Sequence, residues 1–278
     1  GGKPSPFKDI RVRQAVSMSF DRDTYIDTFG NVTPFRSEGL PIQTYWYTSM
    51  GYVPEWTLDP RGKEFGPNAK YYQYNVEEAK KLIQAAESAY GGTFPEIPSS
   101  RVNAVFGAVY TQQVDVMEQW LRDIGLKISS KPLDYNLDYL PNYVTKQGQF
   151  EGILFGSGAT TSPDVVDYYV WRFYSKSGAT SGSLGLGGAG PADPEVDRFI
   201  ERAKAEFDSP KRREIIHDLQ RHLAEKAYAV IHPGVADSLS LLWPAIRNVD
   251  VWQGDSRAAL PGLSILPLWY DDSKPHRA

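Results

Sequence analysis

Residues 6–22 read PFKDIRVRQAVSMSFDR, and this stretch decides how the chain begins to fold. Its apolar residues recur at near-helical spacing: Val12, Ala15, Val16 and Phe20. This spacing places them on one face and predicts an amphipathic helix. Polar residues are predicted to lie off that face: Arg11, Arg13 and Gln14.

A second helix is predicted directly after the first. Asp21 or Asp23 can cap it, because a short carboxylate side chain accepts hydrogen bonds from the free N–H groups of the first turn. The helix is expected to continue through residues 25–29. Gly30-Asn31 ends it, with the glycine expected to supply the left-handed C′ position.

Composition indicates an ordinary globular protein. Apolar residues make up 41% and charged residues 23% of the 278-residue chain, which is long enough to bury a substantial core. The formal net charge is −4 with scattered lysine and arginine, so nucleic acid is not expected as a partner. Aromatic residues reach 13%, which suits a protein that encloses a ligand, although an aromatic core and surface would also account for it. The absence of cysteine excludes disulfides, thiolate metal sites and cysteine nucleophiles.

The ends of the chain carry little targeting information. No apolar run approaches the roughly 18–20 residues needed to span a bilayer, and no signal peptide is evident. The chain starts at Gly1-Gly2-Lys3 without methionine. We therefore expect a processed or excised piece of a longer protein.

Residues 31–74 show little periodicity and contain several prolines. Aromatic side chains gather in this region: Tyr45, Trp46, Tyr47, Tyr52, Trp56, Tyr71, Tyr72 and Tyr74. A loop of this length in a compact domain is usually functional or packed over a surface. Two interpretations stay open, contact with a ligand and a cover over the core.

Helices and strands alternate over residues 75–155. Asn75 is expected to cap a helix that ends at Gly91-Gly92. Its buried face is predicted to hold Ala79, Leu82, Ile83, Ala86 and Tyr90. Further elements are predicted in this order: a strand at 101–109, a helix at 111–124, a strand at 126–129, a short helix at 138–146 and a strand at 150–155. This order is typical of parallel crossover units and predicts an α/β fold.

A loop rich in glycine, serine and threonine follows at 156–164, and an aromatic helix at about 168–174 comes after it. Beyond a Ser/Gly loop at 175–192, Asp193-Pro194 and then Pro210 each open a helix. The first of these helices is expected to bury Val196, Phe199, Ile200, Ala203 and Phe207. The apolar residues 229–233 predict a final strand.

Motifs for phosphate or metal binding are weak. Residues 185–190 match G-x-G-x-x-G, but no strand precedes them and Pro191 follows where a helix should open, so a low-complexity loop is favoured. Titratable residues share one predicted helix: Glu214, His217, Asp218 and His222. Histidines spaced by five residues are poorly placed to share a metal ion, and a solvated helix face is the better interpretation. His232, alone in an apolar strand, is interpreted as a structural histidine.

A hydrolase or transferase on an α/β scaffold is one alternative. It would need a carboxylate pair in the aromatic region, such as Asp134 with Asp138 or Asp164 with Asp167. Carboxylates at such spacing usually cap helices or face solvent, and the chain has no G-x-S-x-G elbow. We therefore expect no enzyme, no catalytic residue, no cofactor and no metal ion. An interaction module that exposes a broad apolar face is a further alternative.

Several sequence blocks, taken in order, resemble one protein family. They are FKDIRVRQAVSMSFDR at 7–22, YNVEEAKKLI at 74–83, WLRDIGLKI at 120–128, DPEVDRFI at 193–200 and FDSPKRREIIHDLQRHL at 207–223. The chain resembles the C-terminal lobe of family 5 extracytoplasmic solute-binding proteins, the oligopeptide- and dipeptide-binding components of ABC importers. The resemblance implies an α/β fold, with a mixed sheet and helices on both faces, as one lobe of a clamshell of the type II periplasmic-binding-protein kind.

The resemblance also implies how the chain is organised and what it does. Residues 1–239 would form the ligand-binding lobe, and residues 240–278 would return to an N-terminal lobe that is absent, so we expect them to be the least regular part. The two lobes would close over a small-molecule ligand and deliver it to a membrane ABC permease. This would take place outside the cytoplasm, in the periplasm or at the cell surface on a lipid anchor.

Candidate ligand-binding residues lie in the aromatic region and near the strand ends: Trp46, Tyr47, Tyr110, Gly156, Ser157, Gly158, Thr160, Thr161 and Tyr168. Peptide binders of the family carry a tryptophan and an aspartate in the loop after the third strand, and the aspartate pairs with the α-amino group of the peptide. The matching positions here are Ser157 and Thr160, and residues 107–113 lack the arginine that some dipeptide binders use. A peptide and an oligosaccharide both stay open as the ligand.

Overall fold

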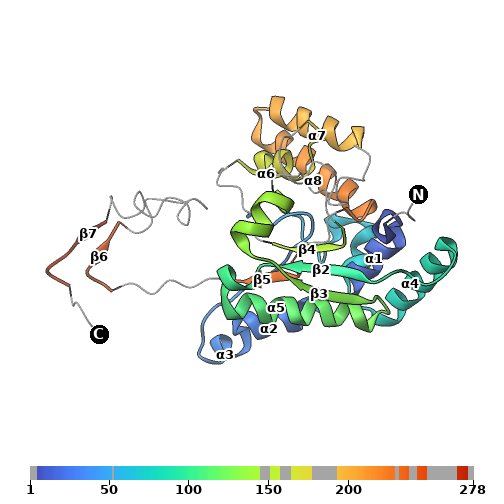
Figure 1. Ribbon diagram of the computed structural model, residues 1–278. Coiled ribbons are helices and arrows are strands. Elements are labelled where there is room, and N and C mark those ends of the chain that lie inside the picture. The colour runs from blue at the N-terminus through green and yellow to red at the C-terminus, as the bar shows by residue number, and fades with distance from the viewer. Residues whose placement is uncertain are drawn as a thin grey trace.

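The computed structural model describes residues 5–51, 53–144, 151–156, 164–176, 193–228, 232–237, 243–248 and 268–274, called here the described residues (Figure 1). Their helices are α1 (Ile10–Ser19), α2 (Arg22–Gly30), α3 (Val32–Ser37), α4 (Val76–Tyr90), α5 (Asn103–Asp123), α6 (Val165–Phe173), α7 (Pro194–Ala205) and α8 (Ser209–Glu225). Short 3-10 helices are η1 (Pro6–Lys8), η2 (Lys63–Phe65) and η3 (Pro67–Tyr72), and η4 (Tyr135–Val144) is π-helical. The strands are β1 (Thr44–Trp46), β2 (Ile97–Arg101), β3 (Ile128–Pro132), β4 (Ile153–Phe155), β5 (Gly234–Ala236), β6 (Ile246–Arg247) and β7 (Trp269–Tyr270).

A parallel sheet organises the middle of the chain. Its strand order is β3-β2-β4, and Ser99 of β2 lies opposite Ser130 of β3 and Ile153 of β4. α5 connects β2 to β3, and η4 lies between β3 and β4 in the chain. Both connections are therefore crossovers between parallel strands, and the predicted α/β fold is confirmed.

The first strand of this sheet lies earlier than predicted. It comprises Ile97–Arg101, and a helix begins at Asn103, so the prediction of a strand over 101–109 is wrong. Ser99 and Ser100 are buried in this strand. Their hydroxyl groups are hydrogen-bonded inside the fold, so the strand can be buried without apolar side chains at these positions. A prediction based on apolar residues therefore missed this strand and placed it at 101–109.

Helical elements cover both faces of the sheet. Ser99 points to α5, where its hydroxyl donates a hydrogen bond to Glu118 Oε1 (2.6 Å). Ser100 points to the opposite face, where its hydroxyl and Tyr143 Oη of η4 lie 2.9 Å apart. Successive residues of a strand face opposite sides, so α5 and η4 lie on different faces.

α1 is buried on nearly all sides rather than on one face. Residues 12–19 are all buried, so the prediction that Arg13 and Gln14 lie off the buried face is wrong. The Arg13 guanidinium donates hydrogen bonds to backbone carbonyls of residues 7–8 (2.6 and 3.0 Å) and of residues 226–227 (2.8 and 3.1 Å). These bonds replace water, and the interior can therefore hold an arginine.

α2 begins and ends at polar residues. Asp21 caps its start, where the carboxylate accepts a hydrogen bond from Thr24 N (3.1 Å). Asn31 takes the left-handed position with φ 49° and ψ 38°, so the prediction that Gly30 does so is wrong. Gly30 provides space instead, because a Cβ there would lie 2.7 Å from Ala236 Cβ of β5.

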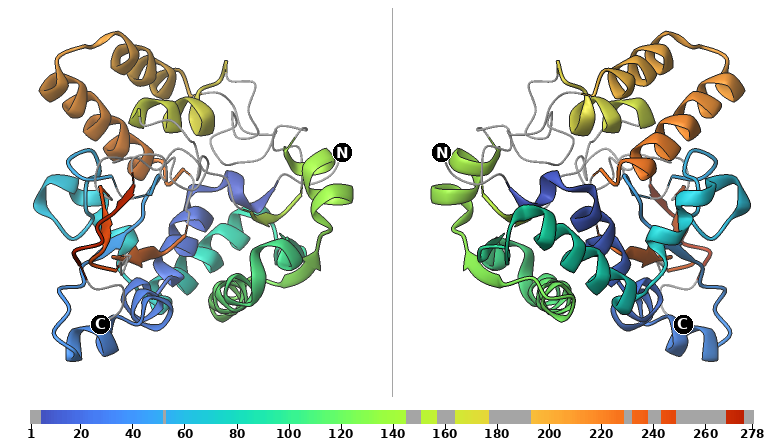
Figure 2. Two further views of the ribbon diagram at one scale, coloured as in Figure 1. Left: turned by 90° about the vertical axis from the view of Figure 1, so that its left-hand side faces the viewer. Right: turned by 90° about the vertical axis from the view of Figure 1, so that its right-hand side faces the viewer.

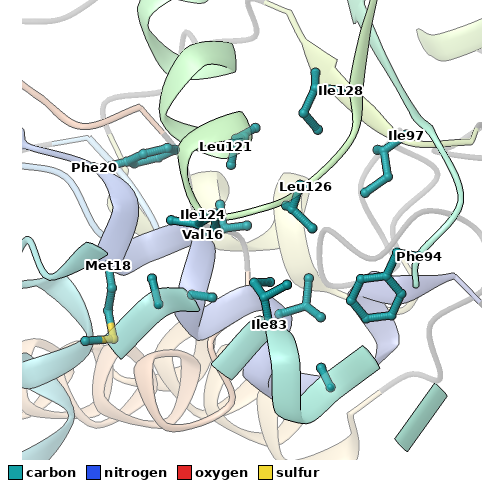
Figure 3. Close-up of a cluster of buried hydrophobic side chains, with 14 residues drawn as sticks. Val16, Met18, Phe20, Ile83, Phe94, Ile97, Leu121, Ile124, Leu126 and Ile128 are labelled. Carbon is teal, nitrogen blue, oxygen red and sulfur yellow. The ribbon is translucent and has the colours of Figure 1, made fainter. Parts of the chain in front are cut away.

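An apolar core joins α1, α4, α5 and the parallel sheet. Side chains from these elements point toward one another in Figure 3, among them Val16, Phe20, Ile83, Phe94, Ile97, Leu121, Ile124, Leu126 and Ile128. α4 begins and ends as predicted, since Asn75 Oδ1 accepts a hydrogen bond from Glu78 N (3.0 Å) and Gly91 adopts φ 83°. This core fixes the sheet against the first helix of the chain.

The proline-rich region after α3 packs over a second core. β1 pairs antiparallel with β5, and Thr44 lies opposite Ala236. Trp46 and Tyr72 are buried in one cluster with Tyr25 of α2. These contacts support the interpretation of the region as a cover over the core.

The helices α6, α7 and α8 lie above the sheet in Figure 1 and at the top of both views in Figure 2. Asp164, Asp193 and Asp208 cap them through hydrogen bonds from backbone N–H groups. Phe207 lies beyond the end of α7 and is 96% exposed, so the prediction that it joins the buried face is wrong. α7 ends at Ala205 because the chain turns there into α8.

β6 and β7 form a sheet of their own, with Ile246 opposite Tyr270. In Figure 1 this pair lies apart from the other labelled elements. The predicted strand at 229–233 falls partly outside the described residues, and the strand observed next to it is β5. The glycine motif at 185–190 also lies outside the described residues.

Candidate functional site

The parallel strands end together at one edge of the sheet. β2 ends at Arg101, β3 at Pro132 and β4 at Phe155. Ligands of open α/β sheets bind in the crevice outside the carboxyl ends of the strands. We name this edge the carboxyl edge, and it comprises residues 101–110, 132–139 and 155–156.

Tyr110 links α5 to the end of β4. Its hydroxyl donates a hydrogen bond to the backbone carbonyl of Phe155. Gly107, with φ 83° and ψ −178°, interrupts the helical geometry of α5 just before this tyrosine, a conformation that favours glycine. Burial raises the pKa of Tyr110 to about 12, so its hydroxyl stays neutral and can donate.

Gly156 begins the loop that follows β4, and the ring of Tyr139 lies directly against it. A Cβ at Gly156 would lie 2.8 Å from Tyr139 Oη and 3.0 Å from Tyr139 Cε2. Only glycine therefore fits this position without displacing the ring. Burial also raises the pKa of Tyr139.

Tyr135, Tyr139 and Tyr143 form a series of rings along η4, which we name the tyrosine series. Ring centroids are 5.4 Å apart for the outer pair and 6.5 Å apart for the inner pair, with interplanar angles of 31° and 18°. A π-helix has a wider turn than an α-helix, so residues four apart lie nearly above one another. Tyr135 is half-buried, whereas the other two rings are buried. Sequence analysis missed this series, although the regular spacing of the tyrosines was the available signal.

Glu118 of α5 fixes the strands beneath the carboxyl edge. One of its carboxylate oxygens accepts a hydrogen bond from Ser99 Oγ (2.6 Å) and the other from Ser130 Oγ. These serines are direct partners in the β2–β3 register. Arg122 Nη2 also donates to the carboxylate (3.0 Å), which compensates its buried charge. A single side chain thus holds two parallel strands in register.

Carboxylates at the carboxyl edge serve the local backbone. Asp134 Oδ1 accepts hydrogen bonds from the N–H groups of Asn136 (2.8 Å) and Leu137 (2.7 Å). Asp138 Oδ2 accepts one from Asp134 N (3.1 Å). These two carboxylates therefore act as caps rather than as an acid–base pair.

Asp164 is held in a similar way at the start of α6. It accepts a hydrogen bond from Val166 N (2.9 Å) and forms an ion pair with Arg212 (2.6 Å). The predicted capping role of this carboxylate is therefore observed, and its partner in the hypothetical catalytic pair, Asp167, lies on the first turn of the same helix.

Trp46 and Tyr47 lie together at the end of β1. The Trp46 indole N–H donates to Asp23 Oδ1 (2.8 Å), and the ring is 6% exposed. Tyr47 is half-buried, and its ring centroid lies 5.9 Å from that of His232. Both candidate residues are therefore part of the cover over the second core.

His232 is a hydrogen-bonded structural histidine, as its apolar setting indicates. Its Nε2 lies 2.6 Å from Tyr25 Oη, and its Nδ1 accepts a hydrogen bond from Gly234 N (3.3 Å). Burial lowers the pKa of His232 to about 4. The imidazole is therefore neutral near pH 7.

Tyr168 is half-buried on α6, and the Arg172 guanidinium lies 5.6 Å from its ring centroid. The structure brings Tyr110 and Gly156 together at the carboxyl edge, and it brings Trp46 and Tyr47 together on β1. The remaining predicted residues, Ser157, Gly158, Thr160 and Thr161, lie outside the described residues.

The predicted solvated face of α8 is confirmed for Glu214 and Asp218, which are exposed, and is wrong for the two histidines. His217 is 8% exposed, and burial lowers its pKa. His222 Nε2 lies 2.8 Å from Asp193 Oδ2 at the start of α7, because the two helices pack side by side. Within the described part of the chain, no group of three or more His, Cys, Asp or Glu side chains is arranged to hold a metal ion.

The described residues form an α/β fold whose parallel strands end together at the carboxyl edge. The sequence matches the bacterial extracellular solute-binding proteins, family 5 (middle), over residues 2–181. The chain belongs to this family, and it is therefore part of a binding protein rather than of an enzyme. No curated protein matches the sequence significantly.

Solved structures with the same fold include binding proteins of ABC transporters. The oligopeptide-binding protein AppA from Bacillus subtilis, in complex with a nonapeptide, is 16% identical, with a TM-score of 0.57 over 96% of this chain and 48% of AppA. The periplasmic oligopeptide-binding protein from Thermotoga maritima with bound mannohexaose is also 16% identical, with a TM-score of 0.62 over 96% of this chain and 50% of that protein. The substrate-binding protein CtaP from Listeria monocytogenes is 19% identical, with a TM-score of 0.58 over 83% of this chain and 42% of CtaP. The chain thus spans about half the length of these proteins.

None of the helices in the described ranges is long and apolar enough to cross a membrane.

Proposed function

We propose that the chain is part of the solute-binding component of an ABC importer of the oligopeptide and dipeptide class. It captures a ligand between two lobes, outside the cytoplasm, and delivers it to a membrane permease. Family membership over residues 2–181 is the observation that carries this proposal. The likeness in fold to oligopeptide-binding proteins supports it.

Residues 1–239 act as the C-terminal lobe, and residues 240–278 return to an N-terminal lobe. The coverage of about half of each related structure supports this division. The separate β6–β7 pair supports it too, since Trp243, Trp269 and Tyr270 are each about half exposed there. Closure of the two lobes around a hinge encloses the ligand.

The ligand contacts the lobe at the carboxyl edge, through Tyr110, Gly156 and the loop that contains Ser157, Gly158, Thr160 and Thr161. Tyr47 and Tyr168, which are both half-buried, complete the candidate set, whereas Trp46 is buried in the second core. Peptide is the first ligand class, because AppA holds a nonapeptide. Oligosaccharide is the second, because the Thermotoga protein of the same fold holds mannohexaose.

A thermal-shift titration of the full-length gene product and of this chain tests the proposal, with di- to nonapeptides and oligosaccharides as ligands. Binding to the folded state alone stabilises it by mass action, by about 2.7 kcal/mol at a ligand concentration of 100 times Kd. We expect one ligand class to raise the melting temperature of the gene product, with a smaller effect on this chain. The proposal fails if neither class shifts either protein.

Two variants locate the site. Tyr110→Phe removes the hydrogen bond to the Phe155 carbonyl but keeps the ring, and we expect ligand affinity to fall about fivefold. Phe35→Ala is the control, since Phe35 is 38% exposed on α3, which is not one of the elements that form the carboxyl edge. Equal effects of both variants would argue against ligand contact at the carboxyl edge.

A further inference from the structure

Residues 53–58, which we name the clasp segment, are bound to α8 through their backbone. Gln220 of α8 is 1% exposed, and its side chain binds the clasp segment at two points. Its Nε2 donates a hydrogen bond to the Trp56 carbonyl (2.7 Å), and its Oε1 accepts one from Leu58 N (2.9 Å). The clasp segment can therefore separate from α8 only if these buried hydrogen bonds break.

His217 lies one turn before Gln220 on the same face of α8. The side chain is 8% exposed, and its Nε2 has no hydrogen-bond partner among the described residues. The backbone of Glu55 interacts with the ring, so His217 packs against the clasp segment. A neutral imidazole can leave Nε2 unprotonated, whereas the charged ring carries an N–H donor there with no acceptor among those residues.

The groups around His217 favour its neutral form. Burial lowers the pKa of His217, and the charges of Arg221 and Arg213 on α8 lower it further. Glu214 on α8 and the backbone of Glu55 act in the opposite direction. The Glu55 carboxylate is 78% exposed and lies 3.6 Å from Arg213 Nη1. Because the pKa is lower in the closed form, this form loses stability as the pH falls below 6.5.

The clasp segment is itself strained. Glu55 has φ 65°, in the left-handed region that favours glycine. The turn around it is closed by Trp56 N and Thr57 N, which both donate to the Val53 carbonyl (3.1 Å each), and by Val53 N, which donates to Thr57 Oγ1 (2.8 Å). The backbone N–H groups of residues 53 and 56–58 are therefore all hydrogen-bonded while the clasp segment is closed.

The clasp segment also supports Tyr47, a candidate ligand-binding residue. Thr57 Oγ1 donates a hydrogen bond to the Gly51 carbonyl (3.4 Å). Gly51 in turn lies against the ring of Tyr47, since a Cβ at Gly51 would lie 3.5 Å from it. Opening of the clasp segment therefore removes contacts that position this ring.

We propose that His217 is a pH switch, whose protonation releases the clasp segment from α8 and exposes the ring of Tyr47 while the rest of the lobe stays folded. The described core around α4 contains no histidine, so it should keep its structure over the same pH range. This inference goes beyond the function proposed above. Its test needs no ligand, so the switch can fail while that function stands.

Amide hydrogen exchange of the gene product at pH 7.5 and 5.0 tests the release, with rates corrected for the intrinsic exchange rate at each pH. We expect the protection of residues 53 and 56–58 to fall about tenfold, and that of residues 83–86 in α4 to change less than about twofold. His217→Gln does not titrate and should remove this pH dependence. His222→Gln is the matched control and should retain it, since His222 pairs with Asp193 of α7 rather than with the clasp segment.

Hydroxyl-radical labelling of Tyr47, measured by mass spectrometry at the same two pH values, tests the second part. We expect labelling to increase about twofold at pH 5.0 in the wild type and in His222→Gln, but not in His217→Gln. Unchanged protection of the clasp segment in the wild type overturns the switch, as does a loss that residues 83–86 share. A loss of protection that persists in His217→Gln assigns it to another group and also overturns the proposal. Constant labelling of Tyr47 despite release overturns its link to this ring.

Discussion

Two interiors of the molecule are held together by different forces. The core around α4 is made of apolar side chains that contact one another (Figure 3). The core around Trp46 also contains Arg22, Tyr25 and His232, each with specific hydrogen-bond partners. The first depends on volume and close packing, and the second also depends on hydrogen bonds between buried polar groups. Most donors of this second core have acceptors, although Arg22 Nε has none among the described residues.

Arg22 shows the difference most clearly. The side chain is 2% exposed, and burial lowers its pKa to about 10. It donates to the carbonyls of Ser17 (2.9 Å) and Tyr72 (2.7 Å) and to Ser17 Oγ (3.0 Å). The rings of Phe20, Trp46 and Tyr72 surround the guanidinium at 5.2–5.8 Å. This cation is stabilised by carbonyl dipoles and aromatic faces.

The largest effect is expected when this buried cation is removed. Arg22→Ala removes the donor that the guanidinium supplies to the Tyr72 carbonyl and opens a cavity, so we expect a loss of about 4 kcal/mol in the free energy of unfolding. Urea denaturation measures it. Arg11→Ala is the control, because Arg11 is about one-third exposed in its pair with Asp9, and it should cost less than about 1 kcal/mol. Similar midpoints for both variants would contradict the special role of Arg22.

Acid should weaken the polar interior and spare the apolar one. Burial lowers the pKa of His232 from 6.5 to about 4. A group whose pKa is lower in the folded state stabilises the fold above its unfolded pKa, and this stabilisation is lost as the pH falls from 6.5 toward 4. The difference corresponds to about 3 kcal/mol, so the urea midpoint should decrease across this window.

His232→Gln provides the control for acid sensitivity, since glutamine does not titrate. The variant should show a smaller decrease over the same window, and His217, whose pKa burial also lowers, contributes to the part that remains. Asp9, whose pKa the Arg11 guanidinium lowers, contributes mainly below 3.8. An unchanged pH dependence in His232→Gln would show that His232 is not the group responsible.

A smaller effect is expected in the apolar interior. Ile83 is 2% exposed between α1, α4 and the sheet. Ile83→Val removes one buried methyl group and should cost about 1 kcal/mol. The cost should be the same at neutral and mildly acidic pH, because no titrating group is involved. A cost that grows with acid would mean that the two interiors are coupled.

The smallest effect is expected on the outer face of α4. Lys81 is 73% exposed and lies 3.5 Å from Glu78. Lys81→Ala should change the free energy of unfolding by about 0.3 kcal/mol, since exposed pairs one helical turn apart contribute little. A change above about 1 kcal/mol would show that this face packs against something else.

The apolar interior could be predicted from the sequence and the polar one could not. α4 could be predicted because its buried residues recur at helical spacing, at Ala79, Ile83 and Ala86. Asn75 and Gly91 mark its two ends. The same reasoning found the helix α1 but missed the position of β2 and the burial of Arg13, since Ser99 and Arg13 are buried through partners far away in sequence. Long-range hydrogen bonds leave no local pattern to detect.

The candidate site shows the same limit. The strand–helix order located the carboxyl edge, and Tyr110 and Gly156 meet there. Tyr135 was missed because its importance depends on the ring stacking of η4, which a count of aromatic residues does not reveal. Trp46 was selected as an aromatic residue in a loop, and the structure buries its ring, with the indole N–H donating to the exposed Asp23.

The pairing of β1 with β5 has a consequence during protein synthesis. β1 ends at Trp46 and its partner strand ends at Ala236, and Arg13 likewise binds the carbonyls of residues 226–227. At a synthesis rate of about 5–20 residues per second, the first fifty residues wait roughly 10–40 s for these partners to be made. Until then Trp46, Tyr25 and Arg13 lack their final contacts. Residues 13–46 therefore stay without these contacts for longer than segments whose partners follow them closely in the chain.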